Sequence, residues 1–294
     1  MKVPVFKGSC TAMITPFSEH GIDFRAMAEL LDFQAQNGTS AVLIAGTTGE
    51  SPTLEIHEYE QLVDFCVTYV GGRMKVLSGI GGNNTAACMR KALYSAAAGV
   101  DAVLMSAPYY NKGSKIGLIE HFTSVADASP LPLILYNVPS RTGISIPLEA
   151  YRLLSQHPNI NGVKEASNDI SLIARLIAQC GSNCYIWSGN DDNTVPMMAL
   201  GAIGVISVAS NILPKSISLL CSLCEQGDYA AAGALYRRHA ALFEALFIET
   251  NPIPVKAALR LLSRDSGRLR LPLTEISPAS LSILKSALEE LKLI

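Results

Sequence analysis

A short apolar segment followed by an amphipathic helical segment recurs eight times along this chain of 294 residues. The apolar segments are continuous runs, which is typical of parallel strands covered by helices. The helical segments place apolar residues three and four positions apart. The expected strands are 9–15, 41–45, 75–78, 101–106, 133–136, 160–164, 185–187 and 204–208. The expected helices are 25–36, 55–70, 85–98, 115–126, 147–155, 170–178, 192–200 and 215–225.

Eight such units predict an α/β protein built on a closed (β/α)8 TIM barrel. The alternative is a doubly wound open sheet, which usually has fewer strands and a glycine fingerprint after the first one. Here Thr15, Pro16 and Phe17 stand at that place. After residue 226 the pattern is helical only, with helices expected at 229–247, 254–263 and 278–291. We therefore expect two domains, a catalytic barrel over 1–226 and a small all-helical domain over 227–294.

The charge and hydropathy patterns exclude several classes of protein. The formal net charge is -2 and basic residues form no tract, so we expect neither a nucleic-acid partner nor a membrane-surface partner. The sequence contains no signal-peptide pattern and no apolar run long enough to span a bilayer. These observations predict a cytoplasmic protein.

The cysteines and histidines do not form a metal-binding pattern. Cys221 and Cys224 form a CxxC, but it lies within a helical pattern and no second CxxC follows. The five histidines show no ligand spacing such as HExxH. We expect the seven cysteines to be buried, reduced thiols, and we expect neither a metal nor a cofactor.

The segment 160–167 places Lys164 near the C-terminal end of an expected strand. A lysine is rarely buried without a partner or a function. Burial lowers the pKa of an ammonium group, and the neutral amine can form a Schiff base with a carbonyl substrate. The alternative is a lysine that points into water or pairs with Glu165.

Other reactive side chains follow the expected strands at the end where barrels of this kind carry their active sites. Each of these side chains, taken alone, could have a purely structural role. Threonines between glycines can shape a turn, tyrosines can belong to an interface, and an arginine can be a surface charge. Their occurrence together at matching strand ends favours a site. These residues are Thr47, Thr48, Tyr109, Tyr110, Tyr136, Arg141 and the segment 188–191.

The chain resembles the dihydrodipicolinate synthase family, within the N-acetylneuraminate lyase superfamily. The matching motifs run in family order along nearly the whole chain, and together they are very specific. They are 11–17, 46–51, 108–111, 136–143, 163–166, 188–191, 204–207 and 251–256. The resemblance implies a (β/α)8 barrel with a C-terminal helical domain and a homotetramer built as a dimer of dimers.

The resemblance also implies a reaction, the condensation of pyruvate with L-aspartate-4-semialdehyde to 4-hydroxy-tetrahydrodipicolinate in the diaminopimelate and lysine pathway. Lys164 would form the Schiff base with pyruvate. Tyr136, Thr47 and Tyr110 would form a proton relay, with Tyr110 coming from a neighbouring subunit.

The same resemblance assigns the binding residues. Thr48 and the backbone at Ile206 would hold pyruvate, with Gly189 close by. Arg141 would bind the carboxylate of the semialdehyde at the entrance, since a guanidinium is suited to bidentate contact with a carboxylate.

Two other functions fit parts of this pattern. A pyruvate-dependent aldolase for sialate or 2-keto-3-deoxy sugar acids would share the lysine and the tyrosine, but sialic-acid lyases lack the Pro-x-Arg-Thr-Gly form that contains Arg141. A barrel that senses a keto acid without turnover would not need Lys164 or Tyr136, and both are present.

Many bacterial members of the family are inhibited by lysine, at a site that resembles the region around Ser51, Asn83 and Tyr109 here. Inhibited members have a glutamate and two histidines where this chain has Ala87, Ile56 and Tyr59. We therefore expect weak inhibition by lysine or none. Glu55 or Glu58 could restore an acidic group to that region.

Overall fold

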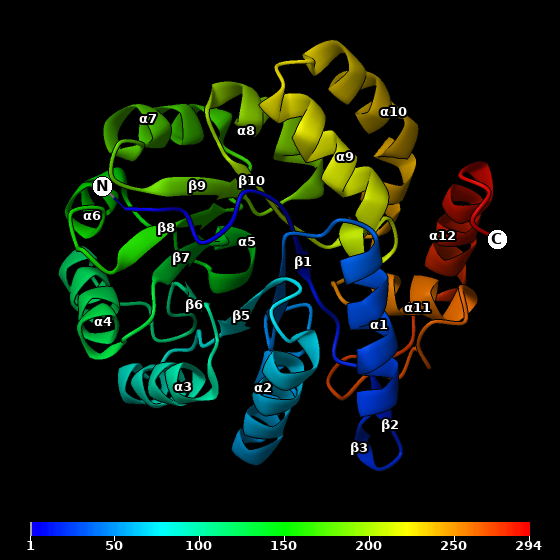
Figure 1. The fold of residues 1–294 in the computed structure, drawn as a ribbon, viewed down its shortest axis with the longest axis horizontal. Coiled ribbons are helices and arrows are strands. Elements are labelled where there is room, and N and C mark those ends of the chain that lie inside the picture. The colour runs from blue at the N-terminus through cyan, green and yellow to red at the C-terminus, as the bar shows by residue number, and fades with distance from the viewer. Residues whose placement is uncertain (1) are drawn as a thin grey trace.

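The computed structural model describes residues 2–294, and in this range eight parallel strands close into a barrel with helices around it (Figure 1). The barrel closes because β1 pairs with β10 on one side and with β4 on the other. This confirms the predicted (β/α)8 barrel, and the open-sheet alternative is wrong. Around the barrel the order is β1 (Gly8–Ala12), β10 (Gly204–Ser207), β9 (Tyr185–Ser188), β8 (Ile160–Glu165), β7 (Leu133–Asn137), β6 (Ala102–Ser106), β5 (Lys75–Gly79) and β4 (Ala41–Ile44).

The helices of the eight units begin and end within three residues of the expected positions. Side-chain caps set several of the starts, because Asp23, Asn84 and Asp169 each accept a hydrogen bond from a free backbone N–H of the first turn. The helices are α1 (Phe24–Gln36), α2 (Ile56–Val70), α3 (Thr85–Ala98), α4 (Lys115–Ala128), α6 (Leu148–Leu154), α7 (Ile170–Cys180), α8 (Thr194–Leu200) and α9 (Pro214–Glu225).

Sequence reasoning missed several short elements. They are the hairpin of β2 (Phe17–Ser18) and β3 (Gly21–Ile22), the one-turn helix α5 (Pro139–Thr142), and the 3-10 turns Ser51–Thr53, Asp191–Asn193 and Ala209–Asn211. Each is too short to show a periodic pattern of apolar residues. Helix α5 matters for the site, because it directly follows β7.

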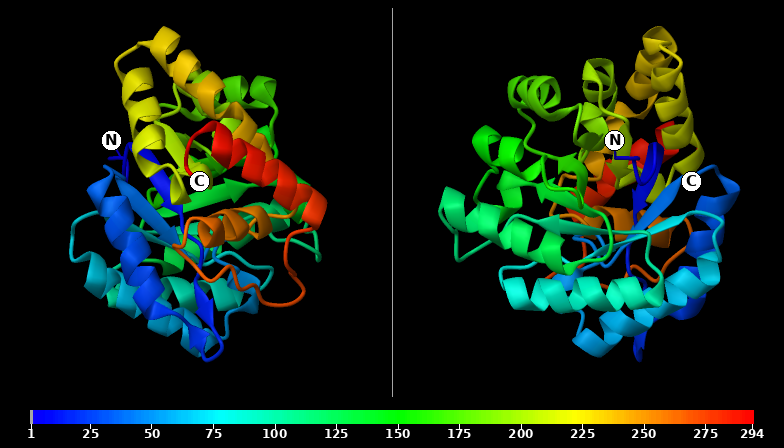
Figure 2. Two further views of the ribbon diagram at one scale, coloured as in Figure 1. Left: turned by 90° about the vertical axis from the view of Figure 1, so that its right-hand side faces the viewer. Right: turned by 60° about the vertical axis from the view of Figure 1, so that its left-hand side comes forward.

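Three further helices follow the barrel, as predicted: α10 (Tyr229–Ala245), α11 (Ile253–Leu261) and α12 (Pro278–Glu290). Helix α10 packs against α8, α9 and α12, and α11 packs against α12. Figures 1 and 2 show α10 beside α9, and α11 beside α12. The division into domains at residue 227 stays a prediction.

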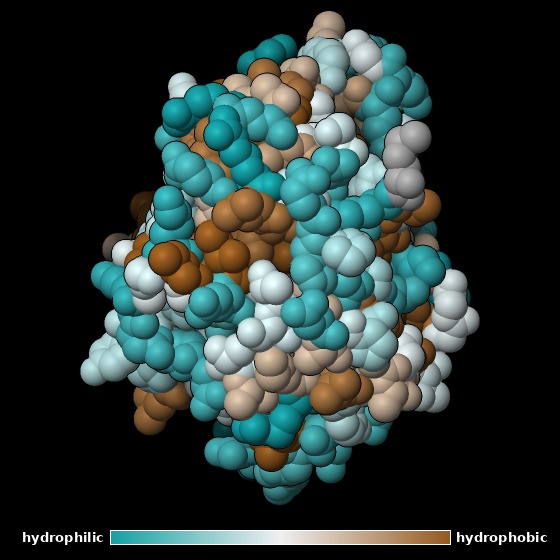
Figure 3. Space-filling view, turned by 90° about the vertical axis from the view of Figure 1, so that its left-hand side faces the viewer, coloured by the Kyte–Doolittle hydropathy of each residue, from teal (hydrophilic) through white to brown (hydrophobic). Residues whose placement is uncertain are grey.

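The surface beside α4, α6 and α7 is mostly hydrophilic, with apolar atoms gathered in a patch near its middle (Figure 3). Each of these helices exposes a large apolar side chain, namely Ile116, Leu153 and Ile170. Within residues 2–294, no helix has the length and apolar character required to cross a membrane.

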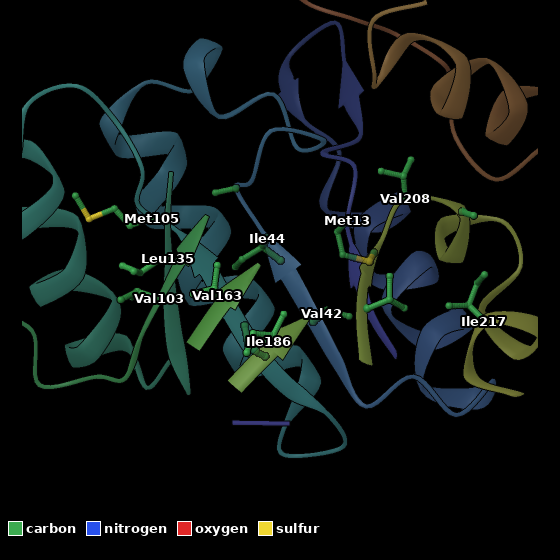
Figure 4. Packing of buried hydrophobic residues seen from close by; sticks show 14 of the residues in the cluster. Met13, Val42, Ile44, Val103, Met105, Leu135, Val163, Ile186, Val208 and Ile217 are labelled. Carbon is green, nitrogen blue, oxygen red and sulfur yellow. The ribbon is translucent and has the colours of Figure 1, made fainter. Parts of the chain in front are cut away.

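The barrel has two layers of core. Side chains on the outer faces of the strands pack against the helices, among them Val42, Val163 and Ile186 (Figure 4). Residues on the inner faces form a smaller second cluster that includes Leu43, Trp187 and Ile206. Successive side chains of a strand point to opposite faces. All seven cysteines are buried in these layers, as predicted.

Candidate active site

The C-terminal ends of the strands open into a cavity of about 800 Å³. A cavity of this size is in the range of small-molecule sites. The expected residues that line it are Thr47, Thr48, Tyr136, Arg141, Lys164 and Gly189, and the end of α10 with the following loop closes one side.

Lys164 lies on β8 directly opposite Tyr136 of β7. Its side chain is only 5% exposed, and Nζ lies 4.4 Å from the centre of the Tyr136 ring. Burial lowers the pKa of Lys164 to about 8. Within residues 2–294 no ion pair joins Lys164 to a carboxylate. The alternatives of a water-facing lysine or a Glu165 partner are therefore wrong.

Glu165 has a different role, because it points to the outer side of the barrel wall. Its carboxylate accepts hydrogen bonds from Asn137 Nδ2 at 2.9 Å, from the Tyr151 hydroxyl at 2.8 Å and from the backbone N–H of Ser167 at 2.8 Å. Asn137 follows Tyr136 as Glu165 follows Lys164, so this contact joins β7 to β8 beside the pair. It fixes the register that brings lysine and phenol together.

Tyr136 is 7% exposed, and burial raises its pKa to about 12. The positive charge of Arg141 acts in the opposite direction but does not outweigh burial. The phenol therefore stays protonated at neutral pH. Beside a neutral amine, it can donate a proton to an oxygen that forms on a substrate carbonyl.

Gly189 lies so close to Lys164 that a side chain would not fit. A Cβ at this position would lie 2.7 Å from Ala166 Cβ and 3.2 Å from Lys164 Cε. The backbone N–H of Gly189 donates to the carbonyl of Glu165 at 2.8 Å. Ile206 is fully buried inside the barrel, in the inner cluster, and is not among the residues that line the cavity.

Thr47 and Thr48 lie on the loop after β4, and both line the cavity. Two buried residues that follow α10 hold this loop. Asn251 Nδ2 donates to Thr48 Oγ1 at 2.9 Å, and Lys256 Nζ pairs with Glu50 Oε1 at 2.6 Å. The role of Asn251 was not predicted, although it begins the motif 251–256.

Arg141 lies on α5 and is largely exposed, at the rim of the cavity. Its Nη2 donates to the backbone carbonyl of Asn251 at 3.0 Å, and the other donors of the guanidinium have no partner within residues 2–294. A free guanidinium at the rim is suited to bind a carboxylate.

Tyr110 is not brought to the cavity of its own chain. Its side chain is 90% exposed, and its backbone is left-handed with φ of 69°. Such a conformation is uncommon for a bulky residue and often marks a functional loop. The preceding Tyr109 lines a second cavity of about 440 Å³ that shares Thr47, Tyr136 and Arg141 with the first.

The described part of the chain contains no group of three or more His, Cys, Asp or Glu side chains placed to hold a metal ion.

Comparisons with known proteins point to one family. A sequence profile described as the Dihydrodipicolinate synthetase family matches residues 5–291. The chain is 45% identical over 293 residues to the 4-hydroxy-tetrahydrodipicolinate synthase of Thermoanaerobacter sp. (strain X514), covering 99% of each protein.

Solved structures agree in fold over nearly the whole chain. The crystal structure of dihydrodipicolinate synthase from Aquifex aeolicus is 42% identical, has a TM-score of 0.96, and is matched over 98% of this chain and 99% of that one. The enzyme from Acinetobacter baumannii, whose crystal structure is a complex with pyruvate, is 35% identical with a TM-score of 0.96, over 98% and 99% of the two chains.

Proposed function

The chain belongs to the dihydrodipicolinate synthetase family, and we propose that the cavity around Lys164 is where it condenses pyruvate with L-aspartate-4-semialdehyde. The product is 4-hydroxy-tetrahydrodipicolinate, in the diaminopimelate and lysine pathway. The observation that carries the assignment is the buried, unpaired Lys164, with a pKa of about 8, against the Tyr136 phenol.

The neutral Nζ of Lys164 attacks C2 of pyruvate, and the carbonyl oxygen leaves as water after it takes up protons. We expect Tyr136 to donate one of them, and Thr47 lines the same cavity. The resulting imine loses a proton from C3 and becomes an enamine. Its C3 attacks the aldehyde carbon of the second substrate. The amino group of that substrate then attacks C2 and releases Lys164.

The residues that line the cavity support an assignment for each substrate. We expect the Thr48 hydroxyl to hold the carboxylate of pyruvate close to Gly189. A contact from the backbone at Ile206 is what the family resemblance implies, since Ile206 itself does not line the cavity. Arg141 binds the carboxylate of the semialdehyde at the rim. Sugar-acid aldolases need a row of hydroxyl-binding groups in that place, so a rim guanidinium favours the short carboxylate-bearing aldehyde over a sialate or ketodeoxy sugar acid.

Treatment with pyruvate and borohydride tests this function. The reductant converts the imine into a stable amine, so the intact mass should rise by one reduced pyruvyl group per chain. Addition of the semialdehyde without borohydride should consume both substrates in equal amounts. A chain that traps pyruvate without consuming the semialdehyde would be a keto-acid sensor or an aldolase for another aldehyde.

Replacing Arg141 with alanine should raise the KM for aspartate-semialdehyde about 10- to 100-fold, because a charge-assisted hydrogen bond is lost. Pyruvate trapping should remain, since Lys164, Tyr136 and Thr48 are untouched. Steady-state kinetics with each substrate varied in turn measures the change in KM for the semialdehyde and for pyruvate separately. An equal loss for both substrates would mean that Arg141 has a structural role.

We propose that the active unit is at least a dimer, within a homotetramer, and that Tyr110 completes the proton relay of a neighbouring subunit. Its 90% exposure and its absence from the described residues that line the cavity of its own chain support this.

Hybrid dimers test the position of Tyr110. Tyr110→Ala and Lys164→Ala subunits should each be poorly active alone. When they are dissociated and mixed, each hybrid should regain one intact site, formed by Lys164 of one subunit and Tyr110 of the other. Activity that does not recover, although native mass spectrometry detects the hybrids, would place Tyr110 outside the relay.

We propose that lysine inhibits this protein weakly or not at all. The described residues that line the second cavity include no acid to bind an ammonium group, and Lys91 adds a positive charge there. Glu58 is engaged by Arg270, and the Glu55 side chain caps α2. Initial rates with up to millimolar lysine should therefore stay near the uninhibited value, and half-inhibition well below a millimolar would refute this.

We also propose a cytoplasmic location, which the seven buried, unpaired cysteines support.

A further inference from the structure

Asn251 contacts two of the residues that the proposed function assigns to substrate binding, Thr48 and Arg141. It lies in the loop between α10 and α11, is 5% exposed, and lines the main cavity. Its side-chain amide donates to Thr48 Oγ1 at 2.9 Å, and its backbone carbonyl accepts from Arg141 Nη2 at 3.0 Å. Thr48 follows β4 and Arg141 follows β7, so one residue from beyond the barrel joins two separate strand ends.

We propose that Asn251 is a positioning residue that orients the Thr48 hydroxyl toward the carboxylate of pyruvate. The inference rests on the proposed function and deepens it. It assigns different tasks to the two contacts of Asn251, because the side chain acts on the pyruvate subsite and the backbone carbonyl acts on the semialdehyde subsite.

The direction of the hydrogen bond between Asn251 and Thr48 explains how the Thr48 hydroxyl is oriented. A hydroxyl has one hydrogen to donate and lone pairs to accept. Because Thr48 Oγ1 accepts from the Asn251 amide, its own hydrogen is left for another acceptor. Accepting one hydrogen bond also strengthens the bond that the same hydroxyl donates. Thr48 is only 3% exposed, so an anion in the cavity, rather than bulk water, is the acceptor that fits.

The surrounding structure holds Asn251 and the threonine loop in place. Glu50, two residues after Thr48, forms a buried ion pair with Lys256, which lies five residues after Asn251. The segment 251–256 therefore contacts the loop 46–51 at two points, once at the cavity wall and once behind it. Fixed backbones at both ends allow a single amide to set the rotamer of Thr48.

Asn251→Ala removes the side-chain contact and keeps the backbone carbonyl. The KM for pyruvate should rise about three- to tenfold, the loss of one hydrogen bond, and the KM for the semialdehyde should stay within about twofold. Asn251→Asp should weaken pyruvate binding further, because a carboxylate accepts the Thr48 hydrogen and repels the substrate anion. Asn193→Ala, which removes an amide outside the cavity lining, should change neither KM.

A double-mutant cycle with Thr48→Ala decides whether Asn251 acts through Thr48. In the Thr48→Ala background, Asn251→Ala should have no further effect on pyruvate binding or trapping. The inference would be overturned if the fold-changes in pyruvate KM of the two single variants multiply in the double variant. Equal losses for both substrates in Asn251→Ala would also overturn it. If the unmodified chain traps pyruvate and Asn251→Ala matches it, this inference alone fails. If the unmodified chain does not trap pyruvate, the proposed function fails and this inference fails with it.

Discussion

Replacing Lys164 with alanine or arginine is expected to abolish pyruvate trapping and to lower kcat by at least about a thousandfold. Alanine removes the amine, and arginine keeps a positive charge but cannot form the imine at neutral pH. No other side chain of the described cavity combines an amine with burial against a phenol. Peptide mapping after borohydride treatment should place the adduct on Lys164 alone.

The rate of imine formation should depend on pH in a defined direction. Only the neutral amine attacks, and burial lowers the pKa of Lys164 to about 8. The rate should therefore rise from pH 6 to pH 8 and level off above about pH 9. A lysine with the ordinary pKa of about 10.4 would continue to gain rate up to about pH 11. The rate of adduct formation, measured by adding borohydride at set times over a series of pH values, distinguishes a pKa of about 8 from the ordinary value.

Lys91 provides a matched control. Burial lowers its pKa as well, and its Nζ lies 4.9 Å from the centre of the Tyr59 ring. It lines the second cavity and not the first. Lys91→Ala should therefore trap pyruvate as the unmodified chain does. If Lys164→Ala still acquires a pyruvyl group, on Lys91 or elsewhere, the assignment of the nucleophile is wrong.

The fold could be predicted because its pattern is local. Buried parallel strands give continuous apolar runs, and surface helices give periodic ones, so all eight repeats were visible. The hairpin of β2 and β3 and the helix α5 span only two to four residues each. At that length no periodicity develops, and only contacts with the rest of the chain decide the conformation.

The candidate site could be predicted in part for a topological reason. The carboxyl ends of all strands of a barrel meet at one mouth, so Thr47, Tyr136 and Lys164 could be grouped without a structure. The alternation of side chains along a strand also places Lys164 and Glu165 on opposite faces of β8, so the sequence itself argues against their pairing.

Asn251 could not be assigned in the same way. It lies 203 residues from Thr48 in sequence and belongs to no strand end. Its contacts depend on how α10 and α11 pack on the barrel, and a repeating pattern carries no information about that. The motif around it was recognised as a resemblance, but only the structure shows which atoms it contacts.

The second large effect is expected on stability, from Lys256→Met. Both members of the Lys256–Glu50 pair are fully buried, with Nζ and Oε1 at 2.6 Å. Glu50 also accepts from the backbone N–H of Arg270 at 3.0 Å. Removing one partner of a buried pair leaves an uncompensated charge and typically costs about 3–5 kcal/mol. At roughly 2 °C per kcal/mol for a chain of this size, the midpoint of thermal unfolding should fall by about 6–10 °C.

Two further variants separate the ion pair from simple loss of packing. Arg260 lies on α11, as Lys256 does, and forms an exposed pair with Glu275, in which the side chains are 54% and 80% exposed. Arg260→Ala breaks this pair and should cost less than about 1 kcal/mol. Glu50→Gln combined with Lys256→Met removes both charges, so the double variant should be more stable than Lys256→Met alone. Measurements at one protein concentration keep assembly constant. If the double variant loses the sum of the two single losses, the two residues stabilise the loop independently, and the pair is not what holds Thr47 and Thr48 at the cavity.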